Sequence, residues 1–258
     1  MINSLITSFV TVFVIQSVFA AFAISFKSDK LTDLSYGLTF VILAASLIFM
    51  NSSPNSFQFL IFAMVFFWGL RLAIYLFIRI LKTKKDKRFD NIRNSSLKFA
   101  QFWFFQAISI WIISLPFIFS LSSKIEVNNL LVTLAGLIIS ICGLLIETVA
   151  DWQKFKFKEK PENKDKWIET GIWKYSRHPN YFGEILVWWG IFISSIPLIK
   201  GFQLLSIIGP LYITFLLLKV SGAPMLEKAY DQKFGKNPKY LKYKKNTSLI
   251  IPLPPKRK

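Results

Sequence analysis

The first 26 residues of the chain read MINSLITSFVTVFVIQSVFAAFAISF (1–26) and contain no charged side chain. A helix of about 20 apolar residues crosses the hydrocarbon core of a bilayer, so this stretch is long enough to span a membrane. A cleaved signal peptide would begin with basic residues, whereas this run has no early Lys or Arg. We therefore interpret residues 3–26 as the first membrane helix.

The composition of the whole chain agrees with this interpretation. Of its 258 residues, 53% are hydrophobic and only 18% are charged, and the mean hydropathy is +0.45. A water-soluble domain of this length needs polar side chains at most surface positions, so the composition argues against one. It also excludes a disordered chain, which would have a low apolar content.

Six further apolar segments follow the first one. The uncharged run from Leu34 to Leu70 is divided by the turn-forming sequence NSSPNS at 51–56. The predicted helices after the first are 34–50, 57–81, 99–121, 128–150, 180–199 and 201–220, followed by a tail at 221–258. The sequence thus predicts an all-α fold, a polytopic integral membrane bundle of about seven transmembrane helices that forms one domain over residues 1–258.

The basic residues predict the orientation of this bundle. Of the 32 Lys and Arg residues, 28 lie in alternate loops and in the segment from Lys219 onwards, which a seven-span chain places on one side of the membrane. The other four are Lys124 and Lys200 in the opposite loops, and Arg71 and Arg79 in the third helix. Cytoplasmic loops are enriched in Lys and Arg, so we expect the N-terminus outside and the C-terminus in the cytoplasm. The net charge of +18 then indicates topology and a lipid-bilayer partner rather than nucleic acid.

Several common kinds of site are absent from the sequence. Cys142 is the single cysteine and His178 the single histidine, so neither an intrachain disulfide nor a zinc cluster is expected, and we predict no metal. The sequence also lacks the G-x-G-x-x-G, G-x-x-x-x-G-K-[ST] and H-E-x-x-H motifs. Any nucleotide must therefore be bound in another way.

Ionisable side chains within the predicted spans are candidates for function, because polar groups in hydrocarbon need partners. Arg79 is near a helix end, where its side chain can reach the interface, whereas Arg71 is two turns deeper and needs a partner or an anion. Glu147, Asp151, Lys154 and Lys158 are spaced to share one face where the fifth helix ends. We expect Lys154 to form surface pairs, and Glu147 to accept hydrogen bonds from a hydroxyl or an amide.

The densest group of polar residues is GIWKYSRHPNYFGE at 171–184. Pro179 suits the start of a helix, and Arg177 with the helix N-terminus offers an anion site. Asn180 and Glu184 share one helix face, and Gly183 permits close approach of a ligand or a helix. Taken singly, His178 could be a hydrogen-bonded scaffold residue, while Tyr175 and Tyr181 could be interfacial aromatics. The cluster as a whole favours a binding site.

The tail adds further candidates. Lys219 and Glu227 lie close enough in sequence to the seventh helix to close over a ligand held at the fifth and sixth helices. Charge alone makes the end of the tail a basic segment attracted to anionic lipid, and we interpret Lys256, Arg257 and Lys258 in this way.

The segment 171–184 resembles the hallmark G-[LI]-W-x-Y-[ST]-R-H-P-N-Y-F-G-E of the DUF1295 family of bacterial membrane proteins, related to steroid 5-alpha-reductases, at every position. Residues 68–72, 147–158 and 221–227 resemble the family too. This resemblance implies a seven-helix reductase in the bacterial inner membrane that binds NADPH and delivers hydride to an activated double bond. The implied cofactor residues are Arg71, Glu147, Asp151, Lys158, Tyr175, Arg177, His178, Asn180, Tyr181, Glu184, Lys219, Glu227 and Tyr243.

The chain also departs from the steroid reductases. These enzymes have a Tyr at the position of Trp68 and a Glu on the second helix, whereas residues 34–50 here contain no acid. A steroid is therefore not the expected substrate, although an apolar enone entering from the lipid agrees with the sequence. No residue is assigned as the proton donor.

Two alternatives remain open. Isoprenylcysteine carboxyl methyltransferases share an R-H-P-x-Y-x-G core, so S-adenosylmethionine could replace NADPH, with His178, Tyr181 and Glu227 contacting the adenosyl group. Glu184 after Asn180 favours the reductase. In the second alternative the protein is a non-catalytic membrane scaffold, in which the 171–184 segment only caps a helix.

Overall fold

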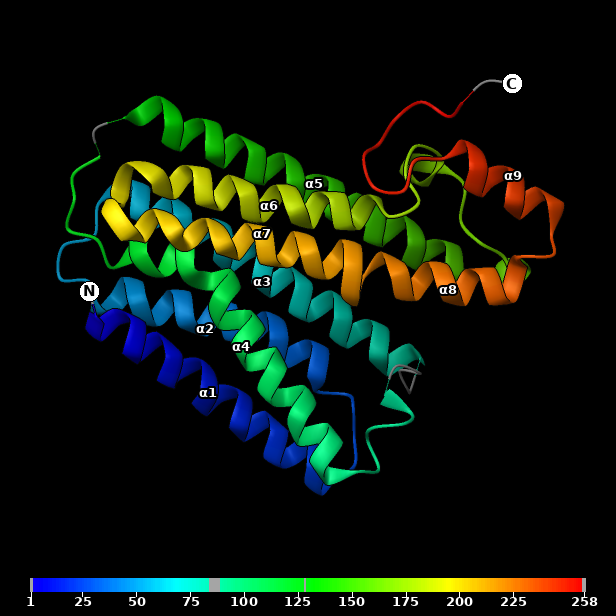
Figure 1. The fold of residues 1–258 in the computed structure, drawn as a ribbon, viewed down its shortest axis with the longest axis horizontal. Coiled ribbons are helices and arrows are strands. Elements are labelled where there is room, and N and C mark those ends of the chain that lie inside the picture. The colour runs from blue at the N-terminus through cyan, green and yellow to red at the C-terminus, as the bar shows by residue number, and fades with distance from the viewer. Residues whose placement is uncertain (1, 84–88, 128, 257–258) are drawn as a thin grey trace. The chain divides into compact units, whose positions relative to one another are not determined.

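The computed structural model describes residues 2–83, 89–127 and 129–256. Within these ranges the fold is all-helical, with no strands, and seven helices are long and apolar enough to cross a membrane (Figure 1). This confirms the predicted fold class. Two compact units can be separated, namely unit 1 (Met1–Leu137 with Ile191–Gly209) and unit 2 (Ile138–Gly190 with Pro210–Lys258).

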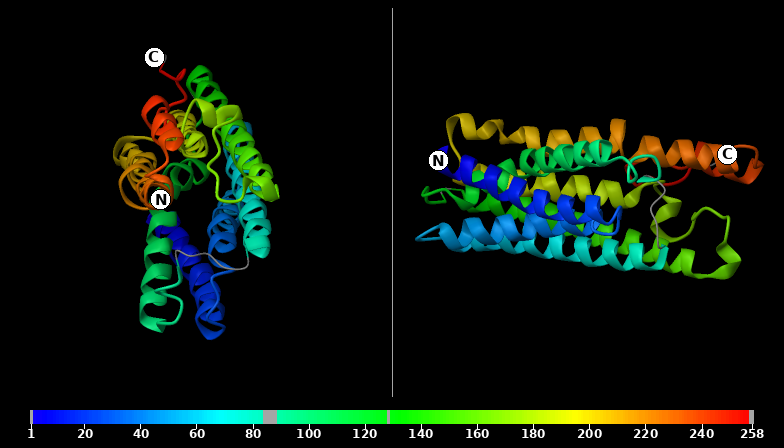
Figure 2. Two further views of the ribbon diagram at one scale, coloured as in Figure 1. Left: turned by 90° about the vertical axis from the view of Figure 1, so that its right-hand side faces the viewer. Right: turned by 90° about the horizontal axis from the view of Figure 1, so that it is seen from below.

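Unit 1 contains the first four helices, in which long apolar runs make the spans. These are α1 (Ile2–Ser25), α2 (Thr32–Met50), α3 (Ser56–Thr83) and α4 (Ser96–Leu121). Helix α2 packs on α3, and α1 packs on α4 (Figure 2). The predicted turn at 51–56 is confirmed, because Asn55 Oδ1 accepts hydrogen bonds from the first backbone amides of α3. The short 3₁₀ helices Ile196–Leu198 and Gly201–Ile207 complete the unit.

Unit 2 is built on α5 (Leu130–Glu159) and α6 (Pro179–Ser195). The first residues of α5 and the last residues of α6 belong to unit 1. The predicted start of the fifth helix at 128 lies outside the described residues. Helix α5 runs past its predicted end at 150, because the residues after Asp151 are good helix formers despite their charge. Helix α5 ends at Glu159, two residues before Pro161.

The seventh span is less regular than the sequence predicts. The 3₁₀ helix Gly201–Ile207 leads into α7 (Ile208–Phe215). Pro210 lies in the first turn of α7, where the backbone N–H that proline lacks is not needed. A π-helical turn, Leu216–Val220, follows, where the Ser221 amide donates to the Leu216 carbonyl five residues earlier. The predicted helix 201–220 therefore consists of a 3₁₀ helix, an α-helix and a π-helical turn, one after the other.

The predicted tail contains two further helices in unit 2. Helix α8 (Ala223–Phe234) begins with Pro224 in its first turn, and α9 (Pro238–Asn246) begins at a proline that follows the capping residue Asn237. The Asn237 side chain accepts a hydrogen bond from the Lys239 amide at 2.9 Å. Hydropathy does not detect these helices because their residues are mostly polar.

Candidate functional site

The loop before α6 is fastened to the last turns of α5. The indole Nε1 of the buried Trp173 donates to the Ala150 carbonyl at 3.0 Å, and the Ile172 amide donates to Gln153 Oε1 at 3.0 Å. Gly171 has a φ of +60°, and a Cβ there would lie 2.3 Å from Gln153 Oε1. Only glycine fits this position, so the loop and α5 are held in one arrangement.

Ser176 and Pro179 determine where α6 begins. The buried Ser176 Oγ accepts a hydrogen bond from the His178 amide at 3.1 Å and donates to the Ile250 carbonyl at 2.7 Å. Pro179 opens the helix, and the His178 carbonyl accepts from the Phe182 amide. The sequence predicts this helix start within one residue, and the structure places Arg177, His178 and Asn180 together at the head of α6.

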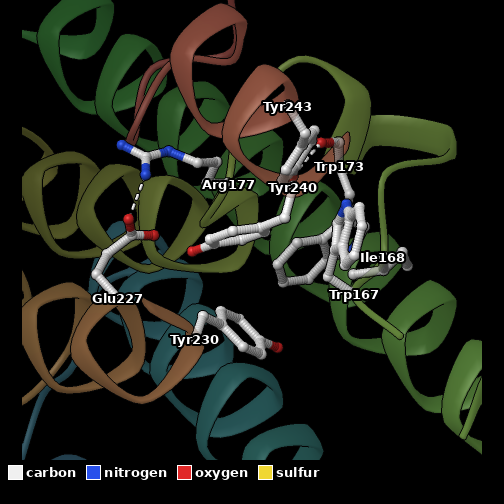
Figure 3. A pocket seen from close by; sticks show the side chains of 8 residues that line it. All are labelled: Trp167, Ile168, Trp173, Arg177, Glu227, Tyr230, Tyr240 and Tyr243. Atoms are coloured by element: carbon white, nitrogen blue, oxygen red, sulfur yellow. Dashed lines mark hydrogen bonds and ion pairs between the residues drawn. The ribbon is translucent and has the colours of Figure 1, made fainter. Parts of the chain in front are cut away.

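Glu227 of α8 is the charged partner of this helix head (Figure 3). One of its carboxylate oxygens forms an ion pair with the Arg177 guanidinium, and the other lies 2.8 Å from His178 Nε2. Lys244 Nζ is a second cation, 3.5 Å from the carboxylate. Glu227 therefore contacts the 171–184 segment directly, and Lys244 joins this contact.

The imidazole of His178 is almost fully buried and stacks on the Tyr181 ring at a centroid distance of 5.3 Å. Burial lowers its pKa below the ordinary value of 6.5, and the hydrogen bond to Glu227 opposes this shift. A neutral imidazole next to a carboxylate carries its proton on Nε2, which leaves Nδ1 as a hydrogen-bond acceptor.

Three buried polar atoms at the head of α6 have no hydrogen-bond partner among the described residues. They are Arg177 Nε, His178 Nδ1 and Asn180 Oδ1. Most buried polar atoms in proteins are hydrogen-bonded, and leaving one unsatisfied costs about 1–3 kcal/mol. One donor and two acceptors within four consecutive residues match a ligand that carries hydroxyl or amide groups.

Glu147 and Asp151 on α5 are both buried, although neither residue type is commonly found inside a protein. A Cβ at Gly183 would lie 2.6 Å from the Glu147 amide and 2.6 Å from the Gly143 carbonyl. Gly183 therefore serves the close approach of α5 and α6. This contact brings Glu147 beside the first turns of α6.

The remaining predicted site residues are less closely grouped. Glu184 and Tyr181 are half-buried on α6, and the Tyr243 hydroxyl donates to the Trp173 carbonyl at 2.8 Å. The side chains of Lys158, Tyr175 and Lys219 are exposed. Arg71 belongs to unit 1 and lies on α3, whereas all the other predicted residues belong to unit 2.

Sequence reasoning missed several residues that shape this region. Gln153 and Ser176 order the loop through backbone hydrogen bonds, which spacing alone does not reveal. Lys244 lies beyond the seventh span, in a part of the chain for which no helix was predicted. The missed signals were the proline at the start of each tail helix and the row of lysines in α9.

A small cavity lies beside Arg177 and Glu227, and aromatic rings from the loop and the two tail helices surround it (Figure 3). Its lining residues are Trp167, Ile168, Trp173, Arg177, Glu227, Tyr230, Tyr240 and Tyr243. The volume is about 10 Å³, which is about the space of one water molecule. The cavity cannot hold a nucleotide in this conformation.

Comparison with known proteins gives one match. The family model described as "Protein of unknown function (DUF1295)" matches residues 12–247, which include every predicted site residue. No curated protein and no solved structure matches the chain.

Proposed function

The chain belongs to the DUF1295 family, and we propose that it is an NADPH-dependent membrane reductase that transfers hydride to the activated C=C bond of an apolar enone. The observation that carries this proposal is the set of three buried, unpartnered atoms at the head of α6 in the described chain. Such atoms are costly unless a ligand satisfies them. The resemblance of residues 171–184 to the reductases selects the kind of ligand.

The chemistry of the helix head fits the polar parts of NADPH. Asn180 Oδ1 and the neutral His178 Nδ1 accept hydrogen bonds, which a carboxamide N–H and ribose hydroxyls can donate. Arg177 supplies a guanidinium for a phosphate, and its Nε is still without a partner among the residues described. We assign the carboxamide and ribose to Asn180 and Glu184, and the phosphates to Lys158, Arg177 and Lys219.

Binding requires a conformational change within unit 2. Glu227 neutralises Arg177 and contacts His178, and the cavity beside them has room for about one water molecule. A dinucleotide therefore binds only when the contact between Glu227 and the head of α6 opens. In this proposal Glu227 competes for the guanidinium of Arg177, which would hold a cofactor phosphate once this ion pair opens.

NADPH supplies the hydride, and the protein has to bind and orient it and exclude water. The apolar spans suit a substrate that enters from the lipid. Trp68, which stands where steroid reductases have a tyrosine, is fully buried and packs edge-to-face on Phe40 at 5.3 Å. An apolar substrate other than a steroid agrees best with this environment. The basic loops and tail favour a cofactor site open to the cytoplasm of a bacterial cell.

Thermal unfolding of the purified protein with either cofactor tests the proposal. NADPH at about 100 times its Kd should stabilise the protein by about 2.7 kcal/mol, which corresponds to a rise of at least about 5 °C in Tm. S-adenosylmethionine should give no rise. Stabilisation by S-adenosylmethionine alone would identify a methyltransferase, and no response to either compound would favour the scaffold.

Turnover provides a second test, which addresses the substrate. NADPH oxidation should depend on an added apolar enone and should disappear in the Asn180→Ala variant. Binding of NADPH without oxidation by any member of a broad enone panel would contradict the substrate class and leave the cofactor assignment intact.

A further inference from the structure

The C-terminal segment 248–253, which we name the strap, lies along the residues that precede α6. The Ser248 carbonyl accepts from the Arg177 amide at 2.9 Å, and the Leu253 amide donates to the Tyr175 carbonyl at 3.1 Å. Ser176 and Ser248 form an isolated parallel bridge, and Ser176 Oγ donates to the Ile250 carbonyl. The strap is therefore fixed by backbone hydrogen bonds at both of its ends.

The strap bends at residues 249–251 around the Ser176 hydroxyl, and exposed and half-buried side chains alternate along it. Leu249, Ile251 and Leu253 point outwards and are 37%, 56% and 53% exposed. Ile250 and Pro252 between them are half-buried. The strap thus exposes three large aliphatic side chains, which the rest of the described chain covers only in part.

This apolar face is held close to the end of a membrane span. The strap pairs with residues 175–177, and the span Pro179–Leu198 begins two residues later. The Leu253 end of the strap binds Tyr175, four residues before the span, and the Ser248 end binds Arg177, two residues before it. At a rise of about 1.5–3.4 Å per residue, Arg177 lies less than about 7 Å from the start of the span. Such a distance lies within the headgroup region, which is about 5–8 Å thick on each side of the hydrocarbon core. Tyr175, an aromatic type enriched at membrane interfaces, is exposed beside the strap.

Three exposed lysines lie at the ends of the strap. Lys174 precedes Tyr175, and the Lys256 amide donates to the Asn246 carbonyl, next to Lys245. None of the three forms an ion pair within the described residues. Aliphatic side chains flanked by unpaired cations match an interface that offers acyl chains and anionic headgroups.

We propose that the strap is an interfacial membrane anchor, in which Leu249, Ile251 and Leu253 insert at the level of the acyl-chain boundary and Lys174, Lys245 and Lys256 bind anionic phospholipid headgroups. Because the strap also holds the backbone of Tyr175 and Arg177 and the hydroxyl of Ser176, it connects the bilayer surface directly to the head of α6. This inference does not depend on which cofactor the site binds.

Site-specific fluorescence tests the insertion. In a Cys142→Ser background, a nitrobenzoxadiazole label is attached at Ile251→Cys, and a reference label at Lys236→Cys in the exposed turn between α8 and α9. The full chain is placed as single copies in nanodiscs of phosphatidylcholine and phosphatidylglycerol, with or without lipids that carry a nitroxide near the headgroup. The nitroxide should quench the label at 251 at least about twofold more than the label at 236, and aqueous iodide should quench in the reverse order.

Equal quenching at the two positions would overturn the proposal. Shielding from iodide without quenching by the nitroxide would also overturn it, because it would indicate a protein contact instead of lipid. Leu253→Cys is a second label position in case Ile251→Cys disturbs folding, since the Leu253 hydrogen bond uses only the backbone.

A charge test identifies the headgroup. Combining Lys174→Ser, Lys245→Ser and Lys256→Ser should reduce nitroxide quenching at position 251 in discs with phosphatidylglycerol, but not in discs of phosphatidylcholine alone. The matched control combines Lys164→Ser, Lys166→Ser and Lys239→Ser, three other exposed lysines, and should leave the quenching unchanged. An equal loss in both triple variants would show that general charge, and not this cluster, attracts the lipid.

Discussion

Two polar clusters, one in each unit, use buried side chains in different ways. In unit 1, Gln16 Nε2 donates to Thr39 Oγ1 at 2.7 Å, and Gln106 Nε2 donates to Gln16 Oε1 at 2.9 Å and to Ser35 Oγ at 3.2 Å. We name these four residues the amide network. It links α1, α2 and α4, and none of its side-chain atoms is a buried atom without a partner.

The head of α6 in unit 2 has the opposite character. It is held by a charged contact to Glu227, yet it retains three buried atoms that no described residue satisfies. Hydrogen bonds between membrane helices contribute modestly to stability, and a closed set such as the amide network needs no further partner. An incomplete set costs free energy unless a ligand completes it. The comparison suggests that the amide network is structural, whereas the head of α6 is built for binding.

The largest effect is expected from removing the charge that holds the α6 head. Glu227→Ala leaves the largely buried Arg177 without its carboxylate, and breaking such a pair costs about 3 kcal/mol or more. The Tm of the purified protein should fall by at least about 6 °C. The control Glu162→Ala removes an exposed acid and should leave Tm unchanged. A small effect of Glu227→Ala would mean that this contact is not needed for the closed conformation.

Breaking the amide network should have the next largest effect. Gln16→Leu removes the partner of Thr39 and of Gln106, so buried polar groups are left unsatisfied and stability falls by about 2 kcal/mol. The control Gln101→Leu changes an exposed glutamine of α4. The rise in Tm on addition of NADPH should be the same in both variants. A selective loss of NADPH binding in Gln16→Leu would show that the network has a binding role after all.

Removing one of the three unpartnered atoms at the head of α6 should raise the stability of the protein. Asn180→Leu removes the unpartnered Oδ1, so the protein without ligand should gain about 1 kcal/mol. The same change should abolish stabilisation by NADPH, which thermal unfolding with and without the cofactor measures. Asn3→Leu, at an exposed position of α1, is the control for added hydrophobicity. If Asn180→Leu destabilises the protein without ligand, the asparagine is structural, like the amide network.

The sequence predicted the spans well, and the site in part. Long apolar segments and the turn at 51–56 determine the seven spans through hydropathy alone. Hydropathy fails where a helix continues in polar sequence, and for this reason it missed the end of α5 at Glu159 and both tail helices. The start of α6 follows from Pro179, but the pairing of Arg177 with Glu227 joins residues 50 positions apart. Such a contact depends on how the helices pack, which local patterns do not specify.

The smallest expected effect concerns pH and again separates the two clusters, because only the head of α6 contains a titrating group. Burial lowers the pKa of His178 below 6.5, so folding favours the neutral imidazole. Above about pH 6.5 the imidazole is neutral in both states, and its contribution to stability does not change with pH. Below that pH the unfolded chain binds a proton that the folded protein resists, so stability falls until the pH reaches the lowered pKa. The Tm of the wild type should therefore decrease more on acidification than that of His178→Gln, whereas Gln16→Leu should follow the wild type. A wild-type Tm that rises relative to His178→Gln would show that the Glu227 carboxylate, and not burial, dominates the titration of this histidine.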